Sequence, residues 1–307
     1  MGEKIKDPGF GNYSNKRAKR MVNSDGSFNI KRVNKPRRLL ETYHYLINVS
    51  WFKLFLLAAL AFLVVNILFA IVYLVIGIEQ IVVPSGTVLQ DFLNAFFFSS
   101  QTLTTLGYGA MAPKGVASGI ISSFEAFIGL SMFSFLTGLI YGRFSKPKAS
   151  IRFSKDIILR DFDHTKAVMF RLVNNRSTVM INPKVTVTLS LTKLNNVGDY
   201  VRSFYALELE RETITYLPTT WTVVHEVNEE SPLCKLTNKD YVEGNGELLV
   251  MISYFDESFD QEVYQMHSYM LSEIKIDYKF SQAYYYDKEG EMVLDYNLFD
   301  KIEHITS

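Results

Sequence analysis

The feature that most constrains this chain is an apolar run from Leu54 to Ile78, LFLLAALAFLVVNILFAIVYLVIGI. The run holds no charged residue and one amide, Asn66, and it exceeds the roughly 20 residues that a helix needs to cross a bilayer core. Trp51 and Tyr73 lie near its two ends, where aromatic rings favour the membrane interface. The alternative is a buried helix of a soluble protein, which this length disfavours. We therefore expect a transmembrane helix.

A second candidate span runs from Val116 to about Tyr141 and is less apolar than the first. It carries several Ser and Gly residues and one carboxylate, Glu125. Small residues let helices approach closely, and polar residues in a membrane usually face protein or water rather than lipid. We expect this second helix to pack against protein and a water-filled path.

Basic residues gather before the first span and after the second, and are nearly absent between the two spans. They are Lys31, Arg32, Lys35, Arg37, Arg38 and Lys53 before or at the start of the first span, and Arg143, Lys146 and Lys148 after the second. Between the spans there is a single basic residue, Lys114. Because positive residues concentrate on the cytoplasmic side, we expect both termini in the cytoplasm. The single cysteine, Cys234, agrees with that reducing compartment, and we expect it to be buried.

The residues before the first span divide into two parts. Residues 1–37 are rich in Lys, Arg, Asn, Gly and Ser, and the composition predicts a mobile basic tail. Residues 38–50, RLLETYHYLINVS, place apolar residues at helical spacing on one face. Such a helix would lie along the inner membrane surface, although a plain N-terminal extension of the spanning helix is the alternative. We place the transmembrane pore domain at 51–145 and a cytoplasmic domain at 146–307.

The segment between the spans begins with a short apolar and aromatic stretch, DFLNAFFFSSQTLT, from Asp91 to Thr104. It is too short to cross a membrane, so we expect a half-crossing helix with Asp91 near its positive N-terminal end. Directly after it comes Thr105-Leu106-Gly107-Tyr108-Gly109.

These five residues are suited to binding a dehydrated K⁺ ion. Backbone carbonyls replace the hydration shell only if they point inward at successive residues, and Gly107 and Gly109 permit the backbone angles this needs. Thr105 adds a hydroxyl, and the Tyr108 ring is expected to point outward against the pore helix. Irregular backbone at membrane depth is tolerated where it lines an ion path. Between two spans, the motif predicts a potassium selectivity filter, with K⁺ as the only metal ion.

At this point the sequence resembles the inward-rectifier potassium channel family, and particularly its bacterial branch. The similarity lies in ETYHYLINVSWF, FFFSSQTLTTLGYGAMAP, IYGRFSKPKASIRFS, TWTVVHEVNEESPL and HSYMLSEI. The resemblance implies a homotetramer in a bacterial inner membrane, with Gly129 as a hinge in the pore-lining inner helix. It also places bulky gate residues at Phe133 and Tyr141, and four Phe side chains would close a pore by excluding water. Packing of Phe133 between helices is the alternative.

One departure from the family pattern concerns rectification. Strong rectifiers carry an acidic residue at about the Phe133 position, where it attracts blocking Mg²⁺ or polyamines, and this chain has none there. Block by Ba²⁺ is still expected at the filter. Glu125 lies nearer the filter, where it would either stabilise the pore helix or bias cation occupancy. We therefore expect weak rectification.

From Ser150 onward, apolar and polar residues alternate in short runs that turn residues separate, as in 166–173, 184–191, 220–227 and 247–254. This pattern predicts an immunoglobulin-like β-sandwich. No catalytic constellation and no cofactor motif occurs in the sequence, so an enzyme is not expected. The chain has 32 basic and 32 acidic residues, which argues against a nucleic-acid partner.

Two charged groups in the sequence carry further expectations. Repeated around a pore, Asp256, Glu257 and Asp260 would raise the local cation concentration, with a solvated turn as the alternative. Anionic lipid head groups are expected at a basic group made of Arg37, Arg38, Arg143, Lys146 and Lys148. The sequence thus predicts a potassium-selective channel gated at its inner mouth. A poorly selective cation channel and a nonconducting membrane sensor are the competing hypotheses.

Overall fold

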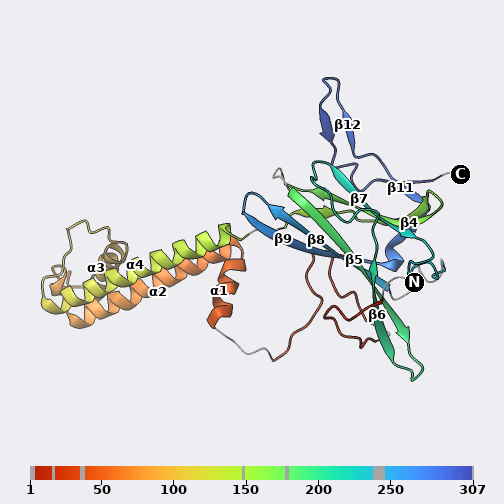
Figure 1. Cartoon of the computed structure of the whole chain (residues 1–307). Helices are drawn as coiled ribbons and strands as arrows, with labels where there is room; N and C mark the ends of the chain where they lie inside the picture. The colour runs from red at the N-terminus through yellow and green to blue at the C-terminus, as the bar shows by residue number, and fades with distance from the viewer. Residues whose placement is uncertain are drawn as a thin grey trace. The chain divides into compact units, whose positions relative to one another are not determined.

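The computed structural model describes residues 4–15, 18–34, 39–146, 149–176, 180–237 and 246–305 (Figure 1). The chain divides into two compact units. One contains Asn34–Lys146 and is helical; the other combines Met1–Val33 with Pro147–Ser307 and is built of strands. The helical unit therefore corresponds to the predicted membrane half, and the strand unit to the predicted cytoplasmic half.

The helical unit holds four α-helices: α1 (Leu39–Asn48), α2 (Trp51–Ile76), α3 (Val88–Leu103) and α4 (Val116–Phe144). Two of them, α2 and α4, are long and apolar enough to cross a membrane, and they lie side by side (Figure 1). Ser50 caps the start of α2 by accepting a hydrogen bond from the amide of Lys53, and Gly77, with φ 103°, ends it. The two predicted spans are thus two helices of the predicted lengths.

A small apolar cluster seats α3 against α2. It consists of Ala70, Tyr73, Ile78, Ile81, Ala95 and Phe98, and a short 3₁₀ helix at Ile78–Gln80 contributes the middle of it. At the start of α3, the Asp91 carboxylate accepts hydrogen bonds from the backbone amide and hydroxyl of Ser85, both at 2.7 Å. These contacts hold α3 against α2, and its 16 residues are too few to cross a bilayer core, as expected of the predicted half-crossing helix.

The strand unit is a pair of five-stranded sheets. One sheet has the order β1-β6-β5-β8-β9, and the other has the order β10-β3-β4-β2 with β7 also paired to β4. The strands of the first are β1 (Lys4–Ile5), β5 (Met180–Leu194), β6 (Tyr200–Leu207), β8 (Gly246–Asp256) and β9 (Gln261–Met270). Those of the second are β2 (Ile151–Phe153), β3 (Ile157–Phe162), β4 (Thr165–Asn174), β7 (Thr220–Val227) and β10 (Ile274–Ile276).

The two sheets share one apolar core, to which β4 of one sheet and β5 and β8 of the other contribute alternate residues. Phe170, Val187 and Val250 are representative, and all three are buried. The prediction of a β-sandwich is confirmed, and β4, β5, β7 and β8 cover the four predicted alternating runs. Two small strand pairs lie outside these sheets: β11 (Tyr278–Phe280) with β14 (Ile302–His304), and β12 (Tyr284–Tyr286) with β13 (Met292–Leu294).

The N-terminal segment packs on this sandwich. Strand β1 pairs antiparallel with β6, and Tyr13 forms a bridge with Val201 farther along the same strand. The buried carboxylate of Glu247 accepts hydrogen bonds from the backbone amides of Met21 and Val22 at 2.8 to 3.2 Å. The composition predicts a mobile tail, whereas the described residues up to Val33 belong to the strand unit. Long-range backbone pairing, which composition does not reveal, accounts for the difference.

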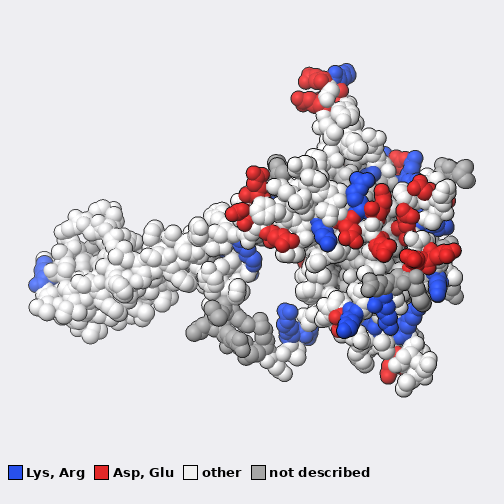
Figure 2. Space-filling model, viewed as in Figure 1, with Lys and Arg blue, Asp and Glu red and all other residues white. Residues whose placement is uncertain are grey.

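Apart from the buried Glu125, the charged residues of α2 and α4 lie near the ends of these helices. In the view of Figure 2, the surface along α2 and α4 is uncharged, whereas the surface of the strand unit carries both signs. Within α2 and α4, Lys53 and Arg143 are near the helix ends, and Glu125 is buried. This distribution is the one that a hydrocarbon environment requires of a spanning helix.

Candidate ion-conducting site

The predicted filter begins directly where α3 ends. The amide of Thr104 donates to the carbonyl of Ser100 at 3.2 Å, and the amide of Thr105 donates to that of Thr102 at 3.0 Å. The Leu106 amide reaches farther back, to the carbonyl of Gln101 at 2.8 Å. The first residues of the filter are therefore suspended from the last turn of α3, so any shift of α3 moves them.

The backbone of the filter alternates in handedness. Thr105, Gly107 and Gly109 have φ values of 58°, 52° and 85°, whereas Leu106 and Tyr108 between them keep negative φ. A regular strand points successive carbonyls to opposite sides, and alternation in the sign of φ is the pattern that turns them to one side. Positive φ is accessible to glycine but costs about 1–3 kcal/mol for a residue such as Thr105. Such strain is typical of a functional site.

The filter side chains are not covered within one subunit. Leu106 is 55% exposed and Tyr108 is 74% exposed, although both are large and apolar or aromatic. A Cβ atom at Gly107 or Gly109 would meet no atom within 4 Å. The glycines are therefore required by backbone conformation and not by crowding inside the subunit.

Behind the filter, a fully buried polar cluster joins α2, α3 and α4. The Tyr73 hydroxyl donates to Glu125 Oε2 at 2.7 Å, and Ser99 Oγ forms a short hydrogen bond with Glu125 Oε1. Ser99 Oγ also lies 3.0 Å from Asn66 Oδ1, and Asn66 Nδ2 donates to the carbonyl of Phe62 at 2.7 Å. Of the two roles that the sequence leaves open for Glu125, contact with the pore helix is the one that this geometry supports.

Tyr73 lies inside the protein and not at a lipid-exposed surface. An aromatic residue near the end of a span predicts an interfacial position, but Tyr73 is 0% exposed and its ring contacts that of Phe98 edge-on. Nothing in the sequence around Ser99 indicates that its hydroxyl contacts a carboxyl group on α4. The only signal in the sequence was the presence of polar groups, Asn66 and Glu125, inside two otherwise apolar helices.

Gly129 packs against the end of α3. A Cβ atom at this position would lie 2.0 Å from the carbonyl oxygen of Leu103 and 2.8 Å from its carbonyl carbon. Only a glycine permits this approach, because both atoms belong to the backbone and no side-chain rotation relieves the clash. The expected hinge role of Gly129 stays a prediction, and the structure gives the residue a separate packing role.

The predicted gate residues lie on an uninterrupted helix. Phe133 and Tyr141 are 72% and 74% exposed, and the eight helical steps from one to the other span about 12 Å along the axis. Phe133 also borders an apolar cavity of about 760 Å³ that extends to Thr104 and Thr105, directly beneath the filter. Both side chains are free to contact other copies of the chain, so their role as a gate stays a prediction.

The predicted lipid-binding group is only partly described. Arg37, Arg38 and Lys148 lie outside the described residues. Arg143 donates from Nε to the carbonyl of Ile47 at 2.9 Å and from Nη2 to that of Val49, and Lys146 Nζ donates to Asn48 Oδ1 at 2.9 Å.

These contacts give Arg143 a structural role at the end of α1. The guanidinium also lies over the ring of Trp51 at 4.8 Å from its centre. Tyr43 approaches α4 at Gly142, where an added Cβ would be 3.0 Å from the Tyr43 hydroxyl. The end of α4 is thereby fastened to α1, the helix predicted to lie along the membrane surface.

Of the three acidic residues at the β8–β9 turn, one is buried and two are exposed. Asp256 is 1% exposed; its Oδ1 accepts from the backbone amide of Ser258, and its Oδ2 lies 3.9 Å from Arg176 Nη1. Glu257 and Asp260 are exposed. The expectation that all three carboxylates face a cation path is thus narrowed to Glu257 and Asp260, because Asp256 is used inside the turn.

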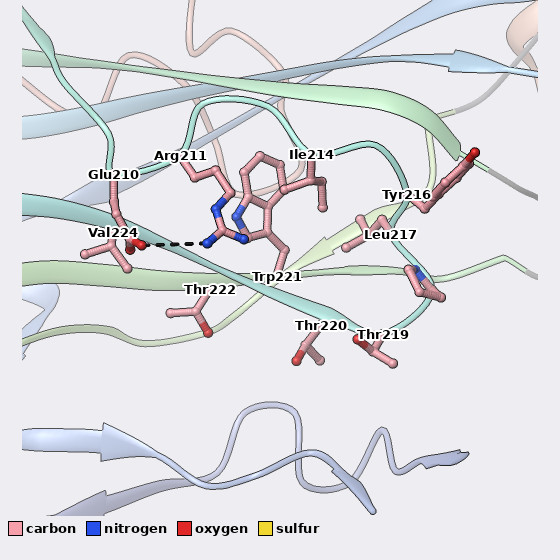
Figure 3. Close-up of a pocket in the computed structure, with 11 residues that line it drawn as sticks. Glu210, Arg211, Ile214, Tyr216, Leu217, Thr219, Thr220, Trp221, Thr222 and Val224 are labelled. Carbon is pink, nitrogen blue, oxygen red and sulfur yellow. Dashed lines mark ion pairs between the residues drawn. The ribbon is translucent and has the colours of Figure 1, made fainter. Parts of the chain in front are cut away.

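A cavity of about 390 Å³ beside β7 is lined mainly by Thr and apolar side chains, with one ion pair, Glu210–Arg211 at 3.9 Å (Figure 3). No group of three or more His, Cys, Asp or Glu in the described ranges is placed to hold a metal ion. Cys234 is exposed, so the expectation that it is buried was wrong.

Comparisons with known proteins match both units. A family model described as "Ion channel" matches residues 60–146, and one described as "Inward rectifier potassium channel C-terminal domain" matches residues 151–307. The inward rectifier potassium channel Kirbac3.1 of Paramagnetospirillum magnetotacticum is 33% identical, over 93% of this chain and 96% of its own. The ATP-sensitive inward rectifier potassium channel 12 of Gallus gallus is 25% identical, over 97% of this chain and 76% of its own.

Proposed function

Since this chain belongs to the inward-rectifier potassium channel family, whose members are ion channels and not enzymes, we propose that four identical copies form one K⁺-conducting pore. The family is generally tetrameric and conducts K⁺. The geometry that supports a homotetramer here is the exposure of Leu106, Tyr108 and Phe133 within a single subunit. Four filters around one axis would cover these side chains and bring their carbonyls together.

The single observation that carries the K⁺ function is the backbone of Thr105–Gly109. Its alternating φ signs turn carbonyls to one side, and its attachment to α3 holds that arrangement in place. Stacked rings of four carbonyls would then replace the water around a dehydrated K⁺ ion. Ba²⁺, which has two charges and a similar size, would bind in the same rings and block them.

The inner mouth is proposed to open and close at Phe133 and Tyr141, with Gly129 as the bending point. A ring of four Phe133 side chains would exclude water from a narrow passage and so stop ions. Motion of the cytoplasmic unit would reach this gate through the end of α4, which Arg143 fastens to α1. Weak rectification follows from the absence of a carboxylate at position 133, which leaves Mg²⁺ and polyamines without a strong site there.

The membrane arrangement is proposed to place both termini in the cytoplasm of a bacterial cell. The chain is a membrane protein with two apolar helices, and its basic residues favour the inner side of the membrane. Lys146 is proposed to attract anionic lipid head groups, together with Arg37, Arg38 and Lys148, which lie outside the described residues. Glu257 and Asp260, repeated four times, would enrich cations at the cytoplasmic entrance.

The test is ⁸⁶Rb⁺ uptake into proteoliposomes that contain the purified full chain, with Ba²⁺ added to block it. Reversal potentials in K⁺ and Na⁺ gradients then give the permeability ratio. A high K⁺ preference supports the proposal, and equal permeability would instead establish a poorly selective cation channel. No uptake across a range of lipids and pH values, from tetramers confirmed by gel filtration, would favour the nonconducting sensor. The variant Gly109→Ala is a negative control because it opposes the positive φ of the filter.

A further inference from the structure

Glu125 is buried completely inside one subunit, at 0% exposure. No Lys, Arg or His of the described residues forms an ion pair with it. Among the residues that the structure describes, its carboxyl oxygens form hydrogen bonds with two hydroxyl groups, those of Tyr73 and Ser99. Because the side chain is already covered, contact with neighbouring copies of the chain cannot supply a counter-charge.

The hydrogen bonds of this cluster can be counted proton by proton. Asn66 Nδ2 donates to the carbonyl of Phe62 at 2.7 Å, and this contact fixes the amide so that Oδ1 faces Ser99. The Ser99 hydroxyl has hydrogen-bond contacts with two oxygens, Asn66 Oδ1 and Glu125 Oε1, but it carries one proton. Asn66 Oδ1 has no proton to donate. The second proton must therefore come from Glu125.

We propose that Glu125 is a neutral carboxylic acid in the folded channel and that it acts as a positioning residue for the filter through α3. The chain of hydrogen bonds runs in one direction. Tyr73 donates to Oε2, and Ser99 donates to Asn66 Oδ1. In the proposed neutral form the contact between Ser99 Oγ and Glu125 Oε1 then carries the carboxylic acid proton, so Oε1 is its donor. Every polar group then has a partner, as buried groups require. If Glu125 were ionised, the single Ser99 proton could serve only one of its two contacts. Ser99 Oγ would then face either Asn66 Oδ1 or Glu125 Oε1 with no proton between the two buried oxygens.

The position of this cluster explains how it acts on the filter. Ser99 lies one helical turn before Leu103, the last residue of α3, and Glu125 lies one turn before Gly129. Helix α4 therefore holds α3 at two successive turns, by a hydrogen bond at Glu125 and by backbone contact at Gly129. The filter starts two residues after Leu103. A neutral Glu125 adds no charge to the ion path, so it sets filter geometry without attracting cations.

Infrared spectroscopy tests the protonation state directly. The full-length tetramer in lipid at neutral pH is compared with the Glu125→Gln variant. We expect the difference spectrum to contain the C=O stretch of a protonated carboxylic acid, shifted in heavy water and absent from the variant. A difference spectrum that contains only carboxylate bands of residue 125 would overturn the proposal. This measurement does not depend on ion conduction.

Ion selectivity tests the positioning role. The amide of Gln donates and accepts where a neutral Glu does, so Glu125→Gln should keep the K⁺ over Na⁺ permeability ratio within about twofold of wild type. Ser99→Ala and Glu125→Ala both remove the hydrogen bond between α3 and α4. We expect the permeability ratio to fall by about tenfold or more, since an ion-binding site tolerates displacement of its ligands by only about 0.5 Å. Ser123→Ala is the matched control, because that hydroxyl is exposed in the subunit and donates to the carbonyl of Gly119 within its own helix.

The outcomes separate this inference from the proposed function on which its flux test rests. Wild-type protein that carries no Rb⁺ overturns K⁺ conduction, whereas the infrared result still decides the protonation of Glu125. If Glu125→Gln loses selectivity as Glu125→Ala does, a charged carboxylate is required and the proposal fails. If Ser99→Ala and Glu125→Ala both keep wild-type selectivity, the positioning role fails. Should Glu125→Ala not assemble, Ser99→Ala gives the same comparison with a smaller change.

Discussion

Replacing Gly129 by Ala should displace the end of the pore helix. The added Cβ would lie 2.0 Å from the carbonyl oxygen of Leu103, whereas carbon–oxygen contacts settle at about 3.3 Å. The two backbones must therefore separate by about 1.3 Å. Rotation of a side chain cannot relieve the clash, and the nearby hydrogen bond between Glu125 and Ser99 limits movement of α3.

Two energetic effects of this substitution oppose each other. Alanine is better than glycine in a helix interior by about 1 kcal/mol, which favours the variant. Overpacking of a well-packed contact typically costs about 1–3 kcal/mol. The steric term should win at Gly129, because the clash involves backbone atoms on both sides. At Gly138, on the same helix, an added Cβ meets nothing within 4 Å, so Gly138→Ala should gain only the helix propensity.

The assay is ⁸⁶Rb⁺ uptake and K⁺ over Na⁺ permeability in proteoliposomes, with gel filtration to confirm that each variant forms tetramers. We expect uptake by Gly129→Ala to fall about tenfold, because the filter tolerates displacement of only about 0.5 Å. Gly138→Ala should stay within about twofold of wild type. Wild-type uptake and selectivity in Gly129→Ala would refute the contact. Equal losses in both variants would mean that flexibility of α4, and not packing against Leu103, is what glycine provides.

Three further predictions concern other long-range contacts of the structure. Glu247→Ala should release the N-terminal segment, because it removes the acceptor of the Met21 and Val22 amides. Hydrogen exchange of these two amides should become faster, and the free energy of opening the segment should fall by about 1.5–3 kcal/mol, the contribution expected of hydrogen bonds to a carboxylate. Burial lowers the pKa of His225, so the unfolded chain binds more protons and the strand unit should lose stability as the pH falls below about 6.5. Thermal unfolding followed by circular dichroism between pH 7.5 and 5.5 should show this, and His225→Gln should weaken the pH dependence. Arg143→Lys keeps the charge but loses the forked donation to carbonyls at the end of α1, so its Rb⁺ uptake should match that of Arg143→Ala in vesicles with or without anionic lipid. Wild-type uptake in the lysine variant would mean that charge alone is required.

The spans and the filter could be predicted because their signals are local. An apolar run reports its own length, and the filter motif requires glycine at alternate positions wherever it occurs. The sandwich was predictable for the same reason, since alternation within each run follows from which face of a strand is buried. Phe133 and Tyr141 lie within the second apolar run or at its end, so the same local signal predicts that both belong to one helix, whereas their role as a gate comes from the family resemblance.

The rest depends on contacts between distant parts of the chain. Glu125 and Ser99 are 26 residues apart, and Glu125 and Tyr73 are 52 apart, so nothing near Glu125 in the sequence indicates its partners. The burial of Asp256 follows from a turn that uses its carboxylate, which looks identical to a solvated turn in the sequence. The N-terminal segment is likewise held in place by a carboxylate more than 200 residues away in the sequence, that of Glu247, which accepts from the amide of Met21.

Strand β1 also has a consequence for the outer side of its sheet. It pairs with β6, the strand that would otherwise end that sheet, and Tyr13 continues the pairing at Val201. An uncovered β6 would present unpaired amides and carbonyls to solvent, which is how strands of separate molecules join edge to edge. By covering the edge of β6, strand β1 thus protects the sheet from edge-to-edge association between molecules. Shortening the N-terminus to improve expression would remove β1, expose the edge of β6 and favour aggregation.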